Sequence, residues 1–360
     1  MQRILSLATL VVLGGLGWTF LREGQATRPV AAPAVDGGTF PGANPWTASG
    51  GLGPAPAGPP STAAAPAAVG APTQYASVPG NGSWPPPPSG PAIRIASYNI
   101  QAFGPSKADK PHILYTLAEI VRQFDVVAIQ EVRTQDDYHI PNFVRLVNQT
   151  GRRYDHIVGP RLGNTTSTEQ YAFLFDADRI EADFSNYYTV RDPDNLLHRE
   201  PLVASFRVRG IPPEEAFTFT LVNVHADPDV VDAEIEALAE AYRVVRLAGR
   251  DEDDVIMLGD FNADDRHLGR IAQIPGVKPL ISGAFTNTRQ NRLYDNLVIH
   301  QPSTTEYLGR SGVFDVMRQF NLTMDQALQV SDHLPVWAEF SAYERDYAGR
   351  IARRGMPVRY

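Results

Sequence analysis

The chain contains no cysteine among its 360 residues. This absence excludes disulfide bonds, thiol catalysis and thiolate metal sites, so any metal must be held by oxygen or imidazole ligands. Positive charge is also scarce, with 32 Lys and Arg against 40 Asp and Glu and a formal net charge of -8. Because nucleic-acid binders are usually basic, this balance argues against tight non-specific binding to nucleic acid. Hard cations such as Mg²⁺ are the expected metals.

A long apolar run occurs only at the N-terminus. Residues 4–21 carry no charge, and their number is near the roughly 17–25 residues that span a bilayer. We therefore expect residues 1–22 to be a signal peptide or signal anchor, and the chain to be exported, either secreted or anchored to the membrane. The candidate cleavage sites are weak ones, Gly24-Gln25-Ala26 and Ala32-Pro33-Ala34. Cleavage and anchoring both stay open.

Large apolar residues are few between residues 23 and 92, where sixteen of the 30 prolines lie. Such a composition cannot offset the entropy of ordering, so this stretch is expected to be a disordered linker rich in Pro, Ala and Gly. A single large domain, residues 93–341, follows. Residues 342–360 form a basic tail with five arginines and two acids. No feature indicates a protein partner, and we expect a monomer.

Short apolar runs rich in β-branched and aromatic residues recur through the domain, as is typical of strands. The expected strands are IRIAS (93–97), DVVAIQ (125–130), YAFLF (171–175), LVASFRV (202–208), FTFTLVNV (217–224), DVIMLG (254–259), NLVIH (296–300) and PVWAEF (335–340). Apolar positions at helical spacing predict helices at 112–124 and 228–248. The mixture predicts an α/β (α+β) sandwich with sheets inside and helices outside.

An acid, an amide or a histidine stands where several of these runs end. The motifs are SYN (97–99), QE (130–131), NVHAD (223–227), GDFN (259–262), YDN (294–296) and SDH (331–333). Ligand sites in such folds gather where strands end. We therefore expect the six motifs to meet at one rim of the sandwich.

The side chains of these motifs match the needs of phosphodiester hydrolysis. The reaction requires charge neutralisation on the phosphoryl oxygens and a positioned, deprotonated water. Histidines transfer protons, and an acid partner orients each of them. Oxygen ligands suit Mg²⁺, with Mn²⁺ as an alternative. The candidate ligands are Asn99, Glu131, Asp260, Asn262 and Asp332.

Each motif has a simpler interpretation when it is taken alone. His225 alone is typical of a hydrogen-bonded structural histidine, and Asn99 or Asp295 alone of a turn residue. Glu131 is harder to explain in this way, because an unpaired acid at the end of a buried strand is costly. GDFN followed by SDHLPV (331–336) is a specific pair. The functional interpretation rests on all six motifs together.

Residues 93 to about 341 resemble the endonuclease/exonuclease/phosphatase superfamily and are most similar to its deoxyribonuclease I-like nucleases. The shared motifs are SYNI, QEVR, GDFN and SDHLPV, with the more specific EQYAFLF (169–175), HREPLVASF (198–206) and VNVHADPDVVDAEIEAL (222–238). The resemblance implies a four-layer sandwich of two central mixed β-sheets flanked by helices. It also implies a metal-dependent endonuclease that hydrolyses DNA phosphodiester bonds by in-line attack of an activated water.

The resemblance further implies a role for each site residue. His225 and His333 would flank the scissile phosphate as general acid and base. Glu169 would orient His225, and Asp295 would orient His333. Glu131 would be the main metal ligand. The residues expected to bind metal, phosphate or the attacking water are Asn99, Asp260, Asn262 and Asp332. Those expected to hold the DNA are Arg133, Arg199 and Asn262.

The chain also departs from the deoxyribonuclease I pattern. Gln101 stands where that pattern has an Arg, and Ser167 where it has a Tyr that packs into the DNA minor groove. Both changes weaken the expected grip on DNA. The family's Ca²⁺ loops cannot be assigned here, so a structural Ca²⁺ is left open. Two other functions stay open: a Mg²⁺-dependent phosphodiesterase or phosphatase acting on phospholipid headgroups or small phosphate esters, and a non-catalytic binding module.

Overall fold

The computed structural model describes residues 91–164, 168–248 and 252–345. The expected signal segment, nearly all of the linker and Ser167 lie outside these ranges, as does the tail beyond residue 345. Among the described residues, no helix is both long and apolar enough to cross a membrane.

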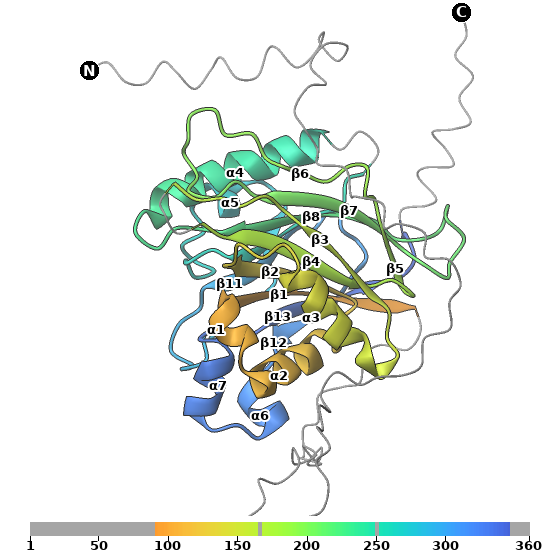
Figure 1. The fold of residues 1–360 in the computed structure, drawn as a ribbon. Helices are drawn as coiled ribbons and strands as arrows, with labels where there is room; N and C mark the ends of the chain where they lie inside the picture. Colours follow the sequence, from red (N-terminus) through yellow and green to blue (C-terminus); the bar gives the residue numbers. More distant parts are fainter. Residues whose placement is uncertain (1–90, 165–167, 249–251, 346–360) are drawn as a thin grey trace, which may run out of the picture. The chain divides into compact units, whose positions relative to one another are not determined.

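A six-stranded mixed sheet forms one half of the domain (Figure 1), in the order β12-β13-β1-β2-β4-β3. β1 runs parallel to β2, and the other neighbours are antiparallel. The strands are β1 (Ala92–Phe103), β2 (Val126–Val132), β3 (Tyr154–Val158), β4 (Gln170–Asp176), β12 (Tyr307–Val313) and β13 (Val336–Ser341).

A seven-stranded mixed sheet forms the other half, in the order β10-β11-β9-β8-β7-β5, with β6 paired to β7. Here β8 and β9 are the parallel pair. The strands are β5 (Ile180–Ala182), β6 (Tyr188–Thr189), β7 (Leu202–Val208), β8 (Thr218–His225), β9 (Val255–Asp260), β10 (Val277–Pro279) and β11 (Asp295–His300).

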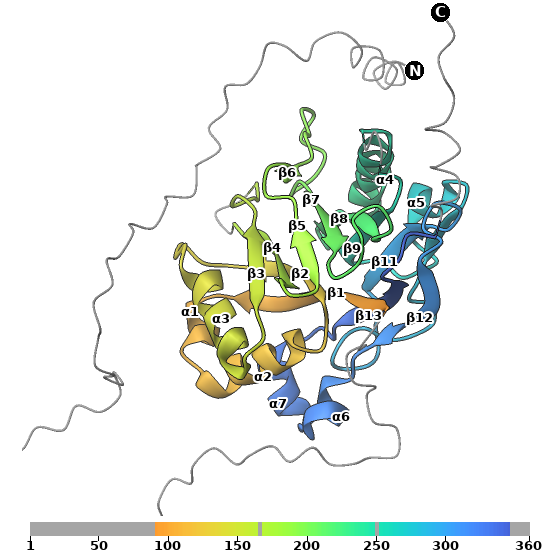
Figure 2. The ribbon, with the colours of Figure 1, turned by 90° about the vertical axis from the view of Figure 1, so that its right-hand side faces the viewer.

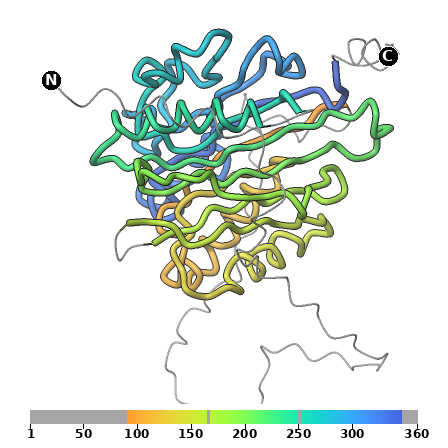
Figure 3. Tube along the Cα trace, turned by 90° about the horizontal axis from the view of Figure 1, so that it is seen from above, coloured from red at the N-terminus to blue at the C-terminus, as the bar shows by residue number. Residues whose placement is uncertain are grey.

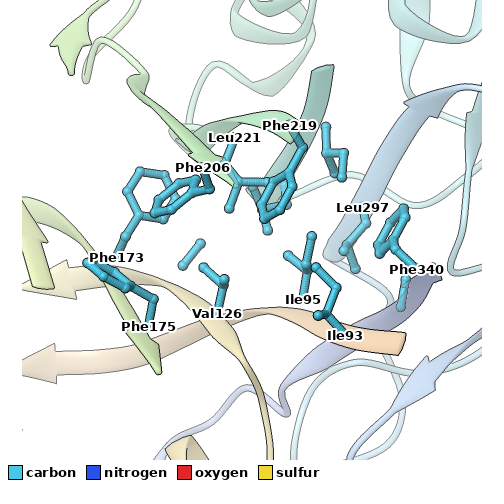
Figure 4. Close-up of a cluster of buried hydrophobic side chains, with 14 of the residues drawn as sticks. Ile93, Ile95, Val126, Phe173, Phe175, Phe206, Phe219, Leu221, Leu297 and Phe340 are labelled. Atoms are coloured by element: carbon cyan, nitrogen blue, oxygen red, sulfur yellow. The ribbon is translucent and has the colours of Figure 1, made fainter. Parts of the chain in front are cut away.

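The main hydrophobic core lies between the two sheets. Figure 4 shows Val126, Phe173 and Ile95 of the six-stranded sheet pointing toward Phe206 and Leu221 of the seven-stranded sheet. Alternate residues of the same strands point to the outer faces, where helices cover them. Because both faces of each sheet are buried, the central strands are apolar almost throughout, which is why they were visible as continuous runs in the sequence.

Helices cover both outer faces (Figure 2), and Figure 3 shows the trace of the domain from above. Those packed against the six-stranded sheet are α1 (Pro105–Ala108), α2 (Pro111–Val121), α3 (His139–Val147), α6 (Val316–Phe320) and α7 (Met324–Val330). A short 3₁₀ turn, Asn148–Thr150, follows α3. The seven-stranded sheet is covered by α4 (Val231–Ala248) and α5 (Gly269–Gln273). The predicted four-layer sandwich is confirmed.

All eight expected strands and both expected helices are present, but several strands extend beyond the apolar runs, among them β1 and β2. β1 continues to Phe103 and β2 to Val132, so Asn99 and Glu131 lie inside strands rather than beyond them. The β1–β2 pairing shifts register between Asn99 and Phe103, where Gln101 and Ala102 have positive φ angles. A bulge of this kind lets a strand continue while it turns particular side chains toward a site.

Candidate active site

Three adjacent strands of the seven-stranded sheet end in a row of ionisable side chains. His225 of β8 is the parallel partner of Asp260 of β9, and Asp295 of β11 is the antiparallel partner of the same aspartate. Gly259 permits this close pairing, because a Cβ atom at residue 259 would lie 1.9 Å from the carbonyl oxygen of Val224. The strand pairing therefore brings together residues of three predicted site motifs.

Glu169, one residue before β4, holds His225. The two side chains form a hydrogen bond of 2.6 Å between Oε1 of Glu169 and Nδ1 of His225, and both are buried. Burial lowers the pKa of His225, but the hydrogen bond and negative charge of Glu169 outweigh it and raise that pKa. Burial raises the pKa of Glu169, yet His225 and two nearby arginines hold it below its usual value. The pair is an imidazole fixed by an ionised carboxylate.

Asp295 holds His333 in the same way on the other side. Oδ2 of Asp295 lies 2.8 Å from Nδ1 of His333 and accepts a second hydrogen bond from the Thr286 hydroxyl at 2.7 Å. Burial opposes the charge on His333, but Asp295 and Asp260 raise the pKa of this histidine well above its usual range. Burial also raises the pKa of Asp295. The site thus holds two imidazole–carboxylate pairs.

Asp260 lies between the two histidines. Its Oδ2 atom is 3.7 Å from Nε2 of His225 and 3.5 Å from Nε2 of His333. The same oxygen accepts a hydrogen bond of 3.0 Å from the amide of Asn99 on β1. Both outer imidazole nitrogens therefore point toward one small region, where a phosphate group could contact them together.

Glu131 is joined to this region through Asn99. The Asn99 amide nitrogen donates to Oε1 of Glu131 at 3.1 Å, and the backbone N–H of Ala102 donates to Oε2 at 2.8 Å. Arg133 lies 3.1 Å from Oε2. Asn99 is placed as a donor that holds the carboxylates of Glu131 and Asp260, while its own oxygen accepts from the backbone of Gln101.

Four non-glycine residues with positive φ angles surround the site: Gln101 (29°), Ala102 (51°), Glu131 (63°) and Asn262 (48°). Such conformations cost about 1–3 kcal/mol each and persist only where the surroundings enforce them. They are not confined to the site, since three further examples occur elsewhere in the described residues. At Glu131, the positive φ angle occurs where the side chain accepts a hydrogen bond from Asn99.

The remaining predicted residues border this centre at different depths. The Asn262 backbone N–H donates to Oδ1 of Asp260, and its side chain donates to the carbonyl of Ala226. Asp332 is partly exposed, with Oδ1 4.0 Å from Nε2 of His333. Arg199 is buried and donates to the backbone carbonyl of His225, instead of lying on the open surface.

Several residues that support the site were not identified from the sequence. Thr286 donates to Asp295, and Ser331 donates to the carbonyl of Asn99 while accepting from the backbone of His333. Ser331 belongs to the SDH motif and could have been noticed there. Thr286 precedes Asp295 by nine residues in a loop, and no sequence pattern links the two.

The donor set fits a hard divalent cation. Ligand atoms of Asp260, Asp295 and His333 lie within 4.8 Å of one another. Oδ1 of Asp295 and Oδ1 of Asp332 are buried and have no hydrogen-bond partner among the described residues. Carboxylate oxygens in need of a partner, with no thiolate nearby, suit Mg²⁺ or Mn²⁺ better than soft metals.

Comparison with known proteins identifies the family to which the chain belongs. The sequence model of the Endonuclease/Exonuclease/phosphatase family matches residues 96–333. The chain belongs to the endonuclease/exonuclease/phosphatase family. It is 31% identical to pig (Sus scrofa) deoxyribonuclease-1-like 1 over 262 residues, covering 69% of this chain and 81% of the relative. It is 29% identical to human (Homo sapiens) deoxyribonuclease gamma, covering 68% of this chain and 85% of the relative.

Solved structures of the family are more distant. A Bacteroides thetaiotaomicron mannosyl-6-phosphatase is 17% identical with a TM-score of 0.48, covering 68% of this chain and 98% of that one. A truncated Caenorhabditis elegans TDP2 is 17% identical with a TM-score of 0.49, covering 70% and 98%. The family match and the two deoxyribonuclease relatives show that the chain is a hydrolase of the endonuclease/exonuclease/phosphatase family, distantly related to deoxyribonuclease I-like nucleases. Members of the family typically use divalent metals.

Proposed function

We propose that this protein is a metal-dependent endonuclease that hydrolyses DNA by in-line attack of an activated water, with His225 and His333 as the acid–base pair. The observation that carries the proposal is the convergence of the two histidines. Each is held by its own carboxylate, and their outer nitrogens lie 3.7 and 3.5 Å from the same oxygen of Asp260. A phosphodiester placed there would have a proton donor on one side and a proton acceptor on the other.

The two imidazole–carboxylate pairs suit the roles of proton donor and proton acceptor. One histidine must be neutral to take a proton from water, and the other must be charged to protonate the leaving oxygen. The carboxylate partners raise both histidine pKa values, so a charged imidazole is present at neutral pH. Glu169 and Asp295 also fix the ring orientations, because each accepts from the inner nitrogen of its histidine. Asp260 completes the group by facing both outer nitrogens and would position the attacking water.

The residues proposed to hold the metal lie beside this pair. Glu131, Asp260 and Asp332 offer carboxylate oxygens, Asn262 borders them, and Asn99 aligns the first two. When bound, the divalent ion neutralises phosphoryl charge and makes water a better nucleophile. Mg²⁺ is the proposed ion, with Mn²⁺ as a substitute, because both prefer oxygen ligands.

The proposed DNA contacts come from two arginines of unequal exposure. Arg133 has 37% of its side chain exposed and bridges Glu131 and Glu169. Arg199 is buried, and its NH2 group has no hydrogen-bond partner among the described residues. That group is suited to a phosphate oxygen that enters the site. The names of the deoxyribonuclease relatives support DNA as the substrate.

Plasmid cleavage by the purified full-length chain tests the proposal. Mg²⁺ should convert supercoiled plasmid to nicked and linear forms, and EDTA should stop the reaction. His225→Ala and His333→Ala should lose this activity, whereas His156→Ala, which changes a histidine on β3, should keep it. Absence of metal-dependent cleavage in the wild type, or full cleavage by both active-site variants, would exclude the proposal.

A second candidate is a phosphodiesterase or phosphatase acting on phospholipid headgroups or small phosphate esters. The observation that favours it is a cavity of about 470 Å³ beside the site, lined by residues that include Asn262, Phe285, Arg292 and Tyr294. Such a cavity could hold a compact headgroup.

A panel of plasmid DNA, sphingomyelin and phosphoinositides with the same enzyme preparation distinguishes the two activities. No turnover of any of these, together with no Mg²⁺ or Mn²⁺ binding by calorimetry, would instead favour a non-catalytic binding module.

Export is a separate proposal, because it concerns residues outside the described ranges. The uncharged run at residues 4–21 supports it. Cell fractionation followed by N-terminal sequencing would test it. An intact N-terminus in the membrane fraction indicates an anchor, a shortened chain outside the cell indicates a cleaved signal peptide, and an intact chain in the cytoplasm contradicts both.

A further inference from the structure

Three buried acids gather at the end of β9 that lies away from the active site. Asp254 immediately precedes β9, Glu306 immediately precedes β12, and Glu344 follows β13. Their exposed fractions are 0%, 0% and 7%. One carboxylate oxygen from each lies within 4.8 Å of the others. Six residues of strand separate Asp254 from Asp260, a distance of about 20 Å, so this cluster is distinct from the active site.

Asp254 brings a fully buried carboxylate into the cluster with no partner of its own. Neither Oδ1 nor Oδ2 has a hydrogen-bond partner among the described residues. The backbone of Asp254 is satisfied, since its N–H donates to Glu252 and its carbonyl accepts from the N–H of Thr220. Only the side-chain oxygens of Asp254 therefore lack hydrogen-bond partners among the described residues. A buried carboxylate without a partner is strongly unfavourable, so something must neutralise it.

Glu306 repeats the pattern on one of its two oxygens. Oε1 accepts from the hydroxyl of Thr305 at 3.2 Å and from the backbone N–H of Arg345 at 2.6 Å. Oε2 is buried and has no hydrogen-bond partner in the described part of the chain. The guanidinium of Arg345 donates to the backbone carbonyl of Thr305. Within the described ranges, neither Asp254 nor Glu306 forms an ion pair with an Arg, Lys or His.

The burial and the negative charge of the cluster raise the pKa of Asp254. Burial, followed by the negative charges of Glu306, Glu252 and Glu344, raises the pKa of Asp254 to about 10. Either a proton shared among the acids or a bound cation could reduce the repulsion between these carboxylates. A proton satisfies one oxygen, whereas a cation can contact several unpartnered oxygens at once.

We propose that Asp254, Glu306 and Glu344 form a binding site for a structural Ca²⁺ ion. All ligands are carboxylate oxygens, which excludes a preference for softer metals such as Zn²⁺ or Cu²⁺. Ca²⁺ suits a buried cluster better than Mg²⁺, because Mg²⁺ loses its water shell reluctantly and usually keeps several waters.

The position of the three acids indicates what the ion does. Asp254 belongs to the seven-stranded sheet through β9, whereas Glu306 and Glu344 flank β12 and β13 of the six-stranded sheet. A cation held between them joins the two sheets at the end opposite the histidines. It therefore stabilises the sandwich and takes no direct part in hydrolysis.

Thermal unfolding of the full-length chain tests the site, with Ca²⁺ added back after treatment with EDTA and its removal. Ca²⁺ at a hundredfold excess over its dissociation constant should raise the unfolding midpoint of the wild type by about 5–10 °C. Asp254→Asn and Glu306→Gln, which keep the side-chain shape, should lose this rise. Asp176→Asn makes the same chemical change at a buried aspartate of β4, outside both this cluster and the active site, and should retain it. Equilibrium dialysis should show one Ca²⁺ per chain fewer in each cluster variant than in the wild type and in Asp176→Asn.

Two outcomes would overturn the inference. One is a wild-type unfolding midpoint that does not change with Ca²⁺, together with an equal or higher midpoint in Asp254→Asn, as a shared proton would give. The other is a Ca²⁺-dependent rise and a Ca²⁺ stoichiometry that persist in both cluster variants. Either result stands independently of whether plasmid DNA is cleaved.

Discussion

Strand β9 has an aspartate at each end, and the two aspartates have opposite surroundings. Asp260 faces the nitrogen atoms of two imidazoles and the amide of Asn99. Asp254 faces the carboxylates of Glu306 and Glu344. One end of the strand therefore combines negative charge with groups that can carry protons, whereas three carboxylates lie close together at the other end.

This difference teaches how burial can serve two purposes in one domain. At Asp260, two imidazole nitrogens lie beside the carboxylate, and in the proposed reaction the imidazoles would exchange protons with the attacking water and the leaving oxygen. At Asp254, both side-chain oxygens are buried and have no hydrogen-bond partner among the described residues, which favours a bound cation. The first arrangement is suited to chemistry and the second to stability. The following predictions separate the two ends experimentally.

The largest effect is expected at the Asp260 end. His225→Ala or His333→Ala should reduce kcat for plasmid cleavage by about 10²–10⁴-fold, because each removes one proton-transfer group. The double variant should lose little more than either single variant, since the two groups act as a unit. Single-turnover cleavage rates provide the measurement. Multiplicative losses in the double variant would show that the histidines act separately.

A smaller effect should distinguish the metal sites proposed at the two ends. Glu131→Gln should raise the Mg²⁺ concentration needed for half-maximal cleavage by about tenfold or more, since even the loss of an outer-shell partner costs 10–100-fold in metal affinity. Asp254→Asn should shift this Mg²⁺ dependence much less while abolishing the response of the unfolding midpoint to Ca²⁺. Mg²⁺ titrations of both variants, performed side by side, test this contrast. Equal shifts in Mg²⁺ dependence would mean that the two ends share one ion.

The pH profile should report the carboxylate that holds His225. Glu169 favours the charged imidazole and raises the pKa of His225. Glu169→Gln removes that charge, so the pKa of His225 should fall and the limb of the kcat/KM profile that it governs should move to lower pH. The same direction holds whether His225 is the acid or the base. A limb that stays in place, or moves to higher pH, would place the titration on another group.

The smallest effect is expected from a single phosphate contact. Arg133→Ala should weaken DNA binding a few-fold and lower the slope of log affinity against log salt by about one, as expected for one lost phosphate contact. Arg207→Ala, which changes a half-exposed arginine on β7, is the matched control. Fluorescence anisotropy with a short duplex, in the presence of Ca²⁺ and without Mg²⁺, provides the measurement. An unchanged slope would remove Arg133 from the interface.

Much of the fold was predictable because its central strands are buried on both faces. Runs such as YAFLF and LVASFRV became β4 and β7 almost residue for residue. β12 (Tyr307–Val313) was missed because its middle residues are Gly-Arg-Ser-Gly and none of its residues is fully buried. The bulge in β1 was also missed, because Gln101 and Ala102 have no residue preference for positive φ angles.

The active site was predictable to a similar extent, and for a chemical reason. Its histidines and acids stand in short motifs, and the structure joins Glu169 to His225 and Asp295 to His333 by hydrogen bonds. Their catalytic and metal-binding roles stay predictions until variants are measured. The cluster around Asp254 could not be predicted, because its three acids come from distant segments that share no motif. Only the packing of the two sheets brings them together.

Gly259 has a consequence for how the GDFN motif is read in other sequences. Any side chain at this residue would meet the backbone of β8 and push the strand away from β9. The imidazole of His225 would then move away from Asp260, although every reactive group would still be present. Gly259→Ala is thus expected to keep all the proposed catalytic residues but to increase the distance between His225 and Asp260. A related sequence that retains the acids and histidines but replaces this glycine should be suspected of having lost the activity.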